Sequence, residues 1–548
     1  YPLMQLIIRD LIYRSPLKYI IGISLAVGLV ACDDFLVETP QTAFEKEGIY
    51  NTVGSANAVL SGAYSTLAEY DYFGFNYFHV VNVTSGMGVS VKDNDKGLTA
   101  MNIEPTNTNM TKMYIGMYKT IRVVNDIIEG MKTSAISSEA EKNRIAGEAY
   151  LMRGMTYFNL VRLFGRVSLV IMPPTSYGDA QTPRAEVADV YKQIISDLTD
   201  AYSKLPLPAD KVVGRPHKYA AQALLAKVYL TLAGNEEESE YWQKAYDAAL
   251  DVYKHGGYEL VTLDKMYGST NKNNKESIIE IQFSGSVNDG RMTETTFPSG
   301  HSLMSNLPAK GKSWGKTRPT QRAFDQFEEG DPRREFSFVH TEYKTRFPRE
   351  GKPDRVALYP LLKKGKGQDY INKDSEYPAW KKYADPTLVI ATNANFVYYR
   401  YADLLLVLAE AANEIGEDAM PYLKLVLDRA RDSNGDGSVA ADEIYPSDPV
   451  ETDKASLREF IFRERLKELT GECDEWYTVR RRGAGYLKKI MEEHNARIEE
   501  LYGNKNVPVI YVYDTSNENV TKNLLMPIPA DEINRNENMG QDEQNPGY

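Results

Sequence analysis

The stretch EAYLMRGMTYFNLVRLFG, residues 148–165, has apolar side chains at the spacing of a helix face. Ala149, Met152 and Tyr157 fall three to five positions apart, and Leu160 and Val161 continue the stripe. Gly165 follows directly, where a glycine commonly ends a helix. The pattern therefore predicts a long helix over residues 138–164.

Comparable patterns lie on both sides of this helix. Small residues at Ala220, Ala223 and Ala226 would let neighbouring helices approach closely. Over about residues 112–256 the pattern predicts antiparallel helix pairs similar to TPR hairpins, although the strict repeat consensus is absent. The other predicted helices cover residues 45–70, 112–128, 184–205, 218–233, 240–254, 398–416, 419–431 and 454–471.

The middle of the chain has a different composition. Gly, Pro, Asn, Lys and Thr dominate residues 257–395, with short strand-like runs at 278–283 and 356–362. This segment is too long for a structureless loop. We expect a mostly α-helical scaffold over about 32–256, an irregular, loop-rich ligand-binding subdomain over 257–395, and C-terminal helices and a tail over 396–548.

The N-terminal residues have the form of an export signal. Basic residues precede an apolar run from Tyr19 to Ala31, which ends in Leu-Val-Ala-Cys at Cys32. The run is shorter than the about 20 residues of a membrane-spanning helix. It predicts a lipoprotein signal peptide over residues 1–31 and lipidation of Cys32.

Composition excludes several functions. The 548 residues carry a net charge of -12, which disfavours a nucleic-acid partner and also strongly acidic glycans. The six histidines lack metal-ligand spacing, and phosphate-binding and nucleophile-elbow motifs are absent. We therefore expect a protein without catalytic activity, although a carboxylate pair for glycoside hydrolysis is compatible with the many acidic residues.

The segment YDYFGFNYF, residues 70–78, is the richest in aromatic residues. Sugar rings stack on aromatic faces, while Asp and Asn bind their hydroxyls. Packing of the same rings inside the scaffold is the alternative. Trp314 in GKSWGK (residues 311–316) is a second stacking candidate. The predicted ligand-binding residues are Tyr70, Tyr72, Phe75, Asn76, Tyr77, Asp93, Asp95 and Trp314.

The segment DSNGDGSVAADE, residues 432–443, fits the calcium loop of an EF-hand. Gly437 stands where that loop turns sharply. The predicted ligands of a structural Ca²⁺ ion are Asp432, Asn434, Asp436, Ser438 through its carbonyl, and Glu443. An ordinary turn-rich loop is the alternative, and Pro446 and Pro449 interrupt the helix that would normally follow.

Five stretches together resemble the SusD/RagB family of Bacteroidetes outer-membrane lipoproteins. They are CDDFL (32–36), EAYLMRGMTYF with LVRLFG (148–165), YRYADLLL with AEA (399–411), the Glu464–Arg481 region, and the PIP and NPGY motifs of the tail. Cys473-Asp474-Glu475 depart from the family pattern before Trp476. In that region we expect an internal salt-bridge network of Glu464, Arg465 and Glu468 with Arg480 and Arg481.

The resemblance implies TPR-like hairpins, a lipid anchor in the outer membrane and exposure at the cell surface. It further implies capture of a glycan for a SusC-like TonB-dependent transporter, without catalysis. Asp33 and Asp34 fit the surface-export signal of such lipoproteins. Binding of peptide or another nutrient by the same fold and, less favoured, a surface glycosidase are the alternatives.

Overall fold

The computed structural model describes residues 48–90, 95–176, 178–285, 317–339, 343–344, 355–356, 378–383, 392–502 and 512–548. The chain divides into two units, Tyr1–Ile49 and Tyr50–Tyr548, and the fold below is that of the second. The predicted signal peptide and Cys32 lie outside the described residues. No helix among the described residues is long and apolar enough to cross a membrane.

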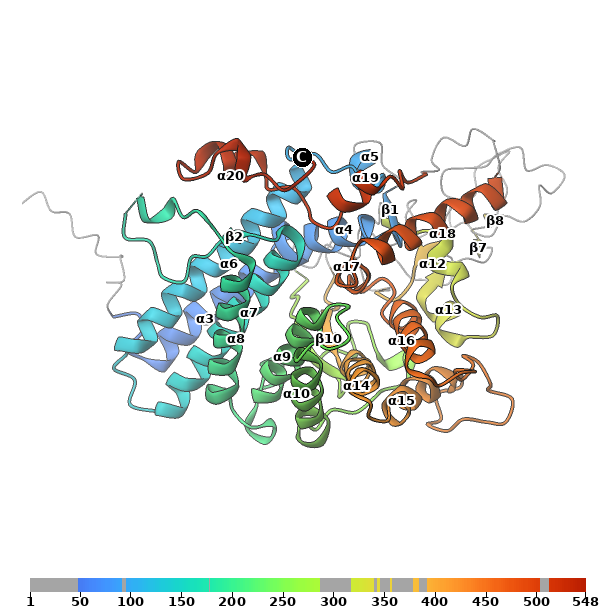
Figure 1. The fold of residues 1–548 in the computed structure, drawn as a ribbon. Helices are drawn as coiled ribbons and strands as arrows, with labels where there is room; N and C mark the ends of the chain where they lie inside the picture. Colours follow the sequence, from blue (N-terminus) through green and yellow to red (C-terminus); the bar gives the residue numbers. More distant parts are fainter. Residues whose placement is uncertain are drawn as a thin grey trace, which may run out of the picture. The chain divides into compact units, whose positions relative to one another are not determined.

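Helices form the scaffold, as predicted, and most pack against the next helix along the chain (Figure 1). α7 contacts both α6 and α8, α9 contacts α8 and α10, and α14 contacts α10, α15 and α16. These helices are α3 (Val53–Ala68), α6 (Thr108–Thr133), α7 (Glu139–Phe164), α8 (Val187–Lys204), α9 (Lys218–Ala233), α10 (Tyr241–His255), α14 (Tyr401–Ile415), α15 (Met420–Arg431) and α16 (Lys454–Glu468).

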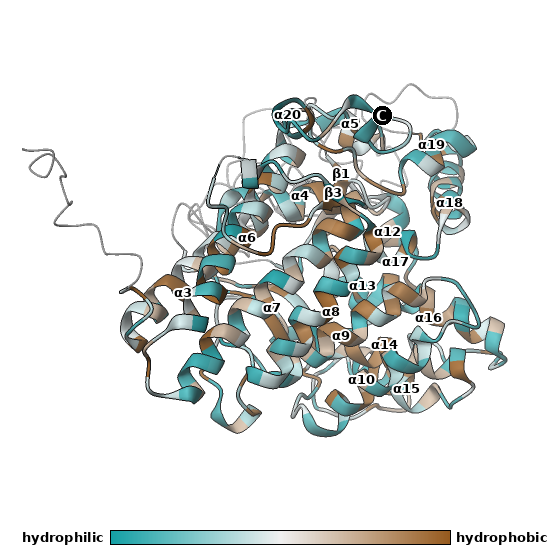
Figure 2. Ribbon diagram, turned by 60° about the vertical axis from the view of Figure 1, so that its left-hand side comes forward, coloured by the Kyte–Doolittle hydropathy of each residue, from teal (hydrophilic) through white to brown (hydrophobic). Residues whose placement is uncertain are grey.

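The core lies between these helices. Nearly all of α14 is buried, from Tyr401 to Glu414. In Figure 2 hydrophobic residues gather on the packed helices, whereas the loops between them are largely hydrophilic. α7 also contributes a buried ion pair. The Arg153 guanidinium donates to both carboxylate oxygens of Asp197 on α8, at 2.9 and 2.7 Å. Apolar packing and this buried pair together hold the helices in register.

Short antiparallel strand pairs join the helices to the middle segment. β4 (Ser277–Ile281) pairs with β10 (Phe396–Arg400), which confirms the predicted strand at 278–283. β1 (Gly88–Ser90) pairs with β5 (Thr317–Pro319). The two-residue pairs are β2 (Val167–Ser168) with β3 (Arg184–Ala185), β6 (Phe338–Val339) with β9 (Ala379–Trp380), and β7 (Tyr343–Lys344) with β8 (Arg355–Val356). Residues 357–362 of the second predicted strand lie outside the described residues.

Several predicted boundaries were wrong. The segment between the predicted helices 45–70 and 112–128 contains a π-helical turn, η1 (Tyr70–Gly74), and a helix. The region after the last predicted helix, 454–471, also contains a long helix. α4 buries all of its residues, so its sequence has no polar face to reveal a helical period. The unpredicted helices are α4 (Asn76–Val83), α5 (Lys96–Thr99), α12 (Gln321–Asp325), α13 (Pro332–Ser337), α17 (Glu475–Arg480), α18 (Ala484–Tyr502), α19 (Asn517–Lys522) and α20 (Ala530–Arg535).

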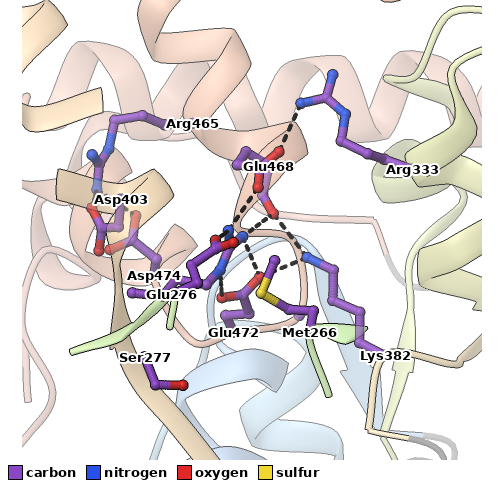
Figure 3. A network of polar contacts seen from close by, with 12 residues as sticks. Met266, Glu276, Ser277, Arg333, Lys382, Asp403, Arg465, Glu468, Glu472 and Asp474 are labelled. Atoms are coloured by element: carbon purple, nitrogen blue, oxygen red, sulfur yellow. Dashed lines mark hydrogen bonds and ion pairs between the residues drawn. The ribbon is translucent and has the colours of Figure 1, made fainter. Parts of the chain in front are cut away.

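A buried ionic network crosses the interior (Figure 3). Glu468 on α16 accepts from Arg333 at 3.0 Å, from Arg400 at 2.7 Å and from Arg429. Arg400 also donates to both oxygens of Glu472 at 2.8 Å. Burial alone would raise the pKa of Glu468, but the three guanidinium charges hold it well below its usual range. Glu468 therefore stays ionised in the core and joins segments distant in sequence.

The predicted buried network around Glu464, Arg465 and Glu468 is present, but the predicted pairing of Arg480 and Arg481 with these acids was wrong. Arg465 pairs with Asp403 at 2.7 Å rather than with a neighbour on its own helix. Arg481 pairs with Glu410 on α14 at 2.5 Å. Arg480 instead donates to backbone carbonyls and lies over the Trp476 ring, 3.2 Å from its centroid. Sequence spacing identifies the charged residues but not which distant helix supplies their partners.

The C-terminal tail returns to the end of α7. The Asn545 amide donates to the carbonyl of Phe164 at 2.8 Å and to that of Met526 at 2.7 Å. Its oxygen accepts from Arg184 at 2.6 Å. The Met526 amide donates to the Leu163 carbonyl at 2.7 Å. The tail thereby satisfies carbonyls that a helix end leaves without an intrahelical partner.

Candidate ligand-binding site

The aromatic segment turns between α3 and α4. η1 is a π-helical turn, a feature frequent at functional sites, and Tyr72 inside it has non-helical dihedral angles. α6 passes directly against this turn. A Cβ atom added to Gly116 would lie 2.9 Å from the Asp71 carbonyl, so only glycine permits the approach. The sequence therefore builds an irregular turn and holds it against a rigid helix.

Most of the predicted aromatic residues lie inside the scaffold. Tyr72, Phe75 and Tyr77 are at most 3% exposed, and Asn76 is fully buried. The Tyr72 hydroxyl accepts from Asn159 at 2.9 Å, and the Tyr77 and Tyr477 hydroxyls are 2.8 Å apart. These side chains form a packed aromatic layer beneath the turn. Their roles in ligand contact stay predictions. Because these side chains are buried, they could contact a ligand only after a change of conformation.

Tyr70 and Asp71 differ, because both are only half-buried. The Tyr70 ring stacks on the Phe75 ring, with centroids 4.4 Å apart and an interplanar angle of 12°. The Asn76 amide lies 3.5 Å from the Asp71 carboxylate. A rigidly supported ring beside a carboxylate suits a polar ligand that also has an apolar face.

His79 connects the aromatic layer to the neighbouring strands. Its Nδ1 lies 2.8 Å from the Thr317 hydroxyl, and its Nε2 lies 3.2 Å from Asp95. Asp95 also accepts from Ser90 at 3.1 Å and from Asn109 at 3.2 Å. Asp95, predicted as a ligand contact, is thus 3% exposed and ties α4 to β1. No sequence pattern singles out His79, because its partners are 16 and 238 positions away.

The β1–β5 pair brings two candidate segments to neighbouring points of the fold. Ser90 is paired with Thr317 in this ladder. Asp93 follows Ser90 by three positions, and Trp314 precedes Thr317 by three. Asp93 and Trp314 themselves lie outside the described residues. The ladder itself is as far as the described residues reach, and contact of Asp93 and Trp314 with a ligand stays a prediction.

Three tryptophans of the described residues lie inside the fold. Trp242 and Trp476 are 3% and 1% exposed. Trp380 is also buried and stacks on Phe338 with centroids 5.5 Å apart. Trp380 therefore closes a small apolar cluster with Phe324 and Phe338 rather than facing solvent.

The predicted calcium loop follows α15. Asp432 ends the helix and accepts from the Asp436 amide at 3.1 Å and the Gly437 amide at 2.9 Å. Gly437 has φ +84°, the left-handed conformation that favours glycine. Glu443 accepts from Ser433 at 2.9 Å and from Ala440 at 2.8 Å. The loop is therefore closed by its own carboxylates.

The donor set is suitable for Ca²⁺, which binds carboxylate, amide and carbonyl oxygens. Glu443 Oε1 and Asp436 Oδ1 each accept from a backbone amide and a serine hydroxyl, so a Ca²⁺ ion would compete with these bonds. Asn434 and Asp436 both point oxygens at backbone amides of the loop. Across the described parts of the chain, no three His, Cys, Asp or Glu side chains converge as metal ligands. Calcium binding accordingly stays a prediction.

The comparisons with known families agree with this architecture. Residues 275–548 match the model of the SusD family. The chain belongs to the SusD family. Residues 34–230 also match a SusD-like family model described as "Starch-binding associating with outer membrane".

Relatives and solved structures cover nearly the whole of this SusD-family chain. It is 25% identical to SusD-like protein P2 of Formosa agariphila, over 96% of this chain and 98% of that protein. A SusD homologue from Bacteroides thetaiotaomicron superposes with a TM-score of 0.75 at 21% identity, over 93% and 99% of the two chains. A structure named laminarin-binding SusD-like protein gives 0.65 at 22% identity, over 90% and 99%. The predicted fold is therefore confirmed.

Proposed function

We propose that this SusD-family protein is a lipid-anchored, cell-surface protein of the outer membrane that captures a glycan and delivers it to a SusC-like TonB-dependent transporter. The match to the SusD family carries the proposal. The starch-binding description of the second matching family and the laminarin-binding neighbour support a carbohydrate ligand. Catalysis is not part of the proposed role.

The described geometry offers one stacking surface for such a glycan. The half-buried Tyr70 is backed by Phe75, and Asp71 adjoins it. The neighbouring β1–β5 pair leads into the segments that contain Asp93 and Trp314. We propose that Tyr70, Asp71, Asp93 and Trp314 contact the glycan and that the deeper rings hold Tyr70 in place.

A glycan array with the purified mature protein tests the ligand class. Tyr70→Ala and Trp314→Ala should each weaken binding of any glycan that the array detects. Tyr253→Ala is the control, because Tyr253 is exposed on α10, away from this turn. Binding of peptides alone would favour the alternative nutrient. Shortening of a bound glycan would establish a glycosidase and overturn the non-catalytic role.

The anchor and the transporter require separate experiments. Cys32→Ala should move the protein from the membrane fraction to the soluble fraction, since the described part has no membrane-spanning helix. Affinity purification of the intact lipoprotein from outer membranes should recover a TonB-dependent transporter. Recovery of no transporter under conditions that retain the protein would contradict the delivery role.

We also propose that the loop at residues 432–443 binds Ca²⁺ in a structural role. Asp432, Asn434, Asp436 and Glu443 would supply side-chain oxygens, and Ser438 its carbonyl. The ion would hold together a segment whose carboxylates otherwise accept from its own backbone amides and serine hydroxyls. The loop is distant in sequence from the residues of the proposed glycan site. We therefore propose that the ion stabilises the fold rather than contacting the glycan.

A further inference from the structure

A cleft of about 410 Å³ lies between α12, α16 and α18. Its volume is within the roughly 300–1,000 Å³ of small-molecule sites. The cleft contrasts with the chain as a whole, whose net charge is -12. Four of its lining side chains are cationic and two are anionic. The lining residues are Arg322, Asp325, Gln326, Arg463, Lys467, Glu493 and Arg497.

Glu493 shows how the cleft holds an acid group. Its two oxygens accept from Arg463 at 2.9 and 2.6 Å, and one of them also accepts from Arg322 at 3.0 Å. Burial opposes its ionisation, yet hydrogen bonds from Arg463 and the charge of Arg322 lower its pKa to about 2. This carboxylate therefore bridges two guanidinium groups, and Arg463 also donates to Glu459 at 2.9 Å.

Lys467 contributes a charge that this carboxylate does not neutralise. It lies one turn beyond Arg463 on α16, and like charges at this spacing repel. Its side chain is only 13% exposed. The nearest carboxylate oxygens, of Glu328 and Glu464, are 3.7 and 4.0 Å away. Within the described part of the chain, its ammonium thus has no acceptor at hydrogen-bond distance.

The opposite rim adds a guanidinium group that is itself paired with carboxylates. Arg497 on α18 donates to Asp325 at 2.6 Å and to Glu500 at 2.7 Å. It is a quarter exposed and faces the same cleft as Lys467. An anion that enters between Lys467 and Arg497 would accept a charge-assisted hydrogen bond from Lys467. It would also reduce the repulsion between Lys467 and Arg463.

We propose that this cleft binds the acid group, a carboxylate or a sulfate, of an anionic saccharide. The inference rests on the proposed glycan-binding function and narrows its ligand class. Lys467 donates the hydrogen bonds to the acid group. Arg463 and Arg497 flank it, and Glu493 keeps the guanidinium groups oriented.

An array of neutral, uronic-acid and sulfated oligosaccharides tests the ligand class, and titration calorimetry then measures the best acidic glycan. Lys467→Gln should weaken its binding about tenfold, the worth of one charge-assisted hydrogen bond, and Lys467→Glu should weaken it further. Lys244→Gln removes a comparable charge from α10, where Lys244 is half-exposed, and should leave binding unchanged. Raising the salt concentration should weaken binding of the acidic glycan more than binding of neutral glycans.

The outcomes separate the two proposals. Binding of neutral glycans alone, or acidic binding that Lys467→Gln leaves intact, overturns the anion cleft while the glycan-binding function stands. Absence of binding to every class of glycan overturns both. Preference for uronic acids over sulfates, or the reverse, identifies which acid group the cleft accepts. Melting temperatures of the variants confirm that each is folded.

Discussion

At the scale of single residues, buried carboxylates determine how this protein responds to mutation and to pH. Glu468 is ionised in the core by three guanidinium groups. Glu475, only seven residues later, has the opposite environment. One of its oxygens has no hydrogen-bond partner in the described structure, and burial raises its pKa to about 7.

Removing the charge of Glu468 should destabilise the fold severely. Glu468→Gln leaves three buried guanidinium groups under-compensated, and the expected loss is about 3–5 kcal/mol in the free energy of unfolding. Urea denaturation measures it. Glu417→Gln, at an exposed position after α14, should change the stability little. Similar losses for the two variants would contradict the role of the network.

Glu475 should make stability fall as pH rises. Its folded pKa is raised, so between the unfolded value near 4.5 and about 7 the native state binds the extra proton. The loss across that window is about 3 kcal/mol and is complete above pH 7. Glu475→Gln removes this titration while retaining the oxygen that accepts from Gly471. The variant should therefore gain stability relative to the parent at pH 8 and not at pH 4, as measured by thermal melting.

At the scale of elements, the helices of the scaffold were predictable, whereas α18, the shorter helices and the aromatic turn were not. The stripe around Met152 and Tyr157 identified α7, because its buried face recurs at helical spacing. α4 escaped detection because every side chain in it is buried. The aromatic candidates follow the first predicted helix, but sequence cannot separate rings that stack inside the fold from the half-buried Tyr70. His79 was unpredictable because its contacts depend on the β1–β5 pairing.

The turn depends on the close approach of α6. Gly116→Ala places a methyl group 2.9 Å from the Asp71 carbonyl, so the backbones must separate. We expect a loss of about 1–3 kcal/mol and weaker glycan binding if the turn forms the site. Gly62→Ala in α3 is the matched control, since its Cβ meets no atom within 4 Å. That change should instead stabilise the helix by about 0.5–1 kcal/mol, as denaturation curves would show.

The loop after α15 should respond to calcium. Millimolar CaCl₂ should raise the melting temperature above that in chelator, because an ion that binds only the folded state stabilises it. Asp432→Asn combined with Glu443→Gln should abolish the shift. Asp531→Asn, on the exposed face of α20, should preserve it. An unchanged midpoint in the parent protein would argue against the site.

At the scale of the whole described unit, long-range polar contacts complete the helical scaffold. Asn545 bonds the end of α7, Arg184 before α8 and Met526 in the tail. The proline-rich and Asn-Pro-Gly-Tyr motifs were recognisable in sequence as family features. Their physical role is visible only in the structure, where the tail lies against the end of α7.

Breaking this junction should weaken the scaffold far from the substitution. Asn545→Ala removes three hydrogen bonds and leaves the Phe164 carbonyl buried without this donor, at an expected cost of about 1–3 kcal/mol. Asn534→Ala, exposed on α20, should be close to neutral. Hydrogen exchange should report faster opening at the C-terminal end of α7 in the first variant only. Unchanged exchange there would contradict the junction.

The same junction sets an order in time. The Phe164 carbonyl and its Asn545 partner are 381 positions apart. A ribosome adding roughly 5–20 residues per second reaches the second about 20–80 s after the first. During that interval α7 has been synthesised but its last turn lacks this partner. The scaffold can therefore be completed only after the tail has been synthesised, late in translation.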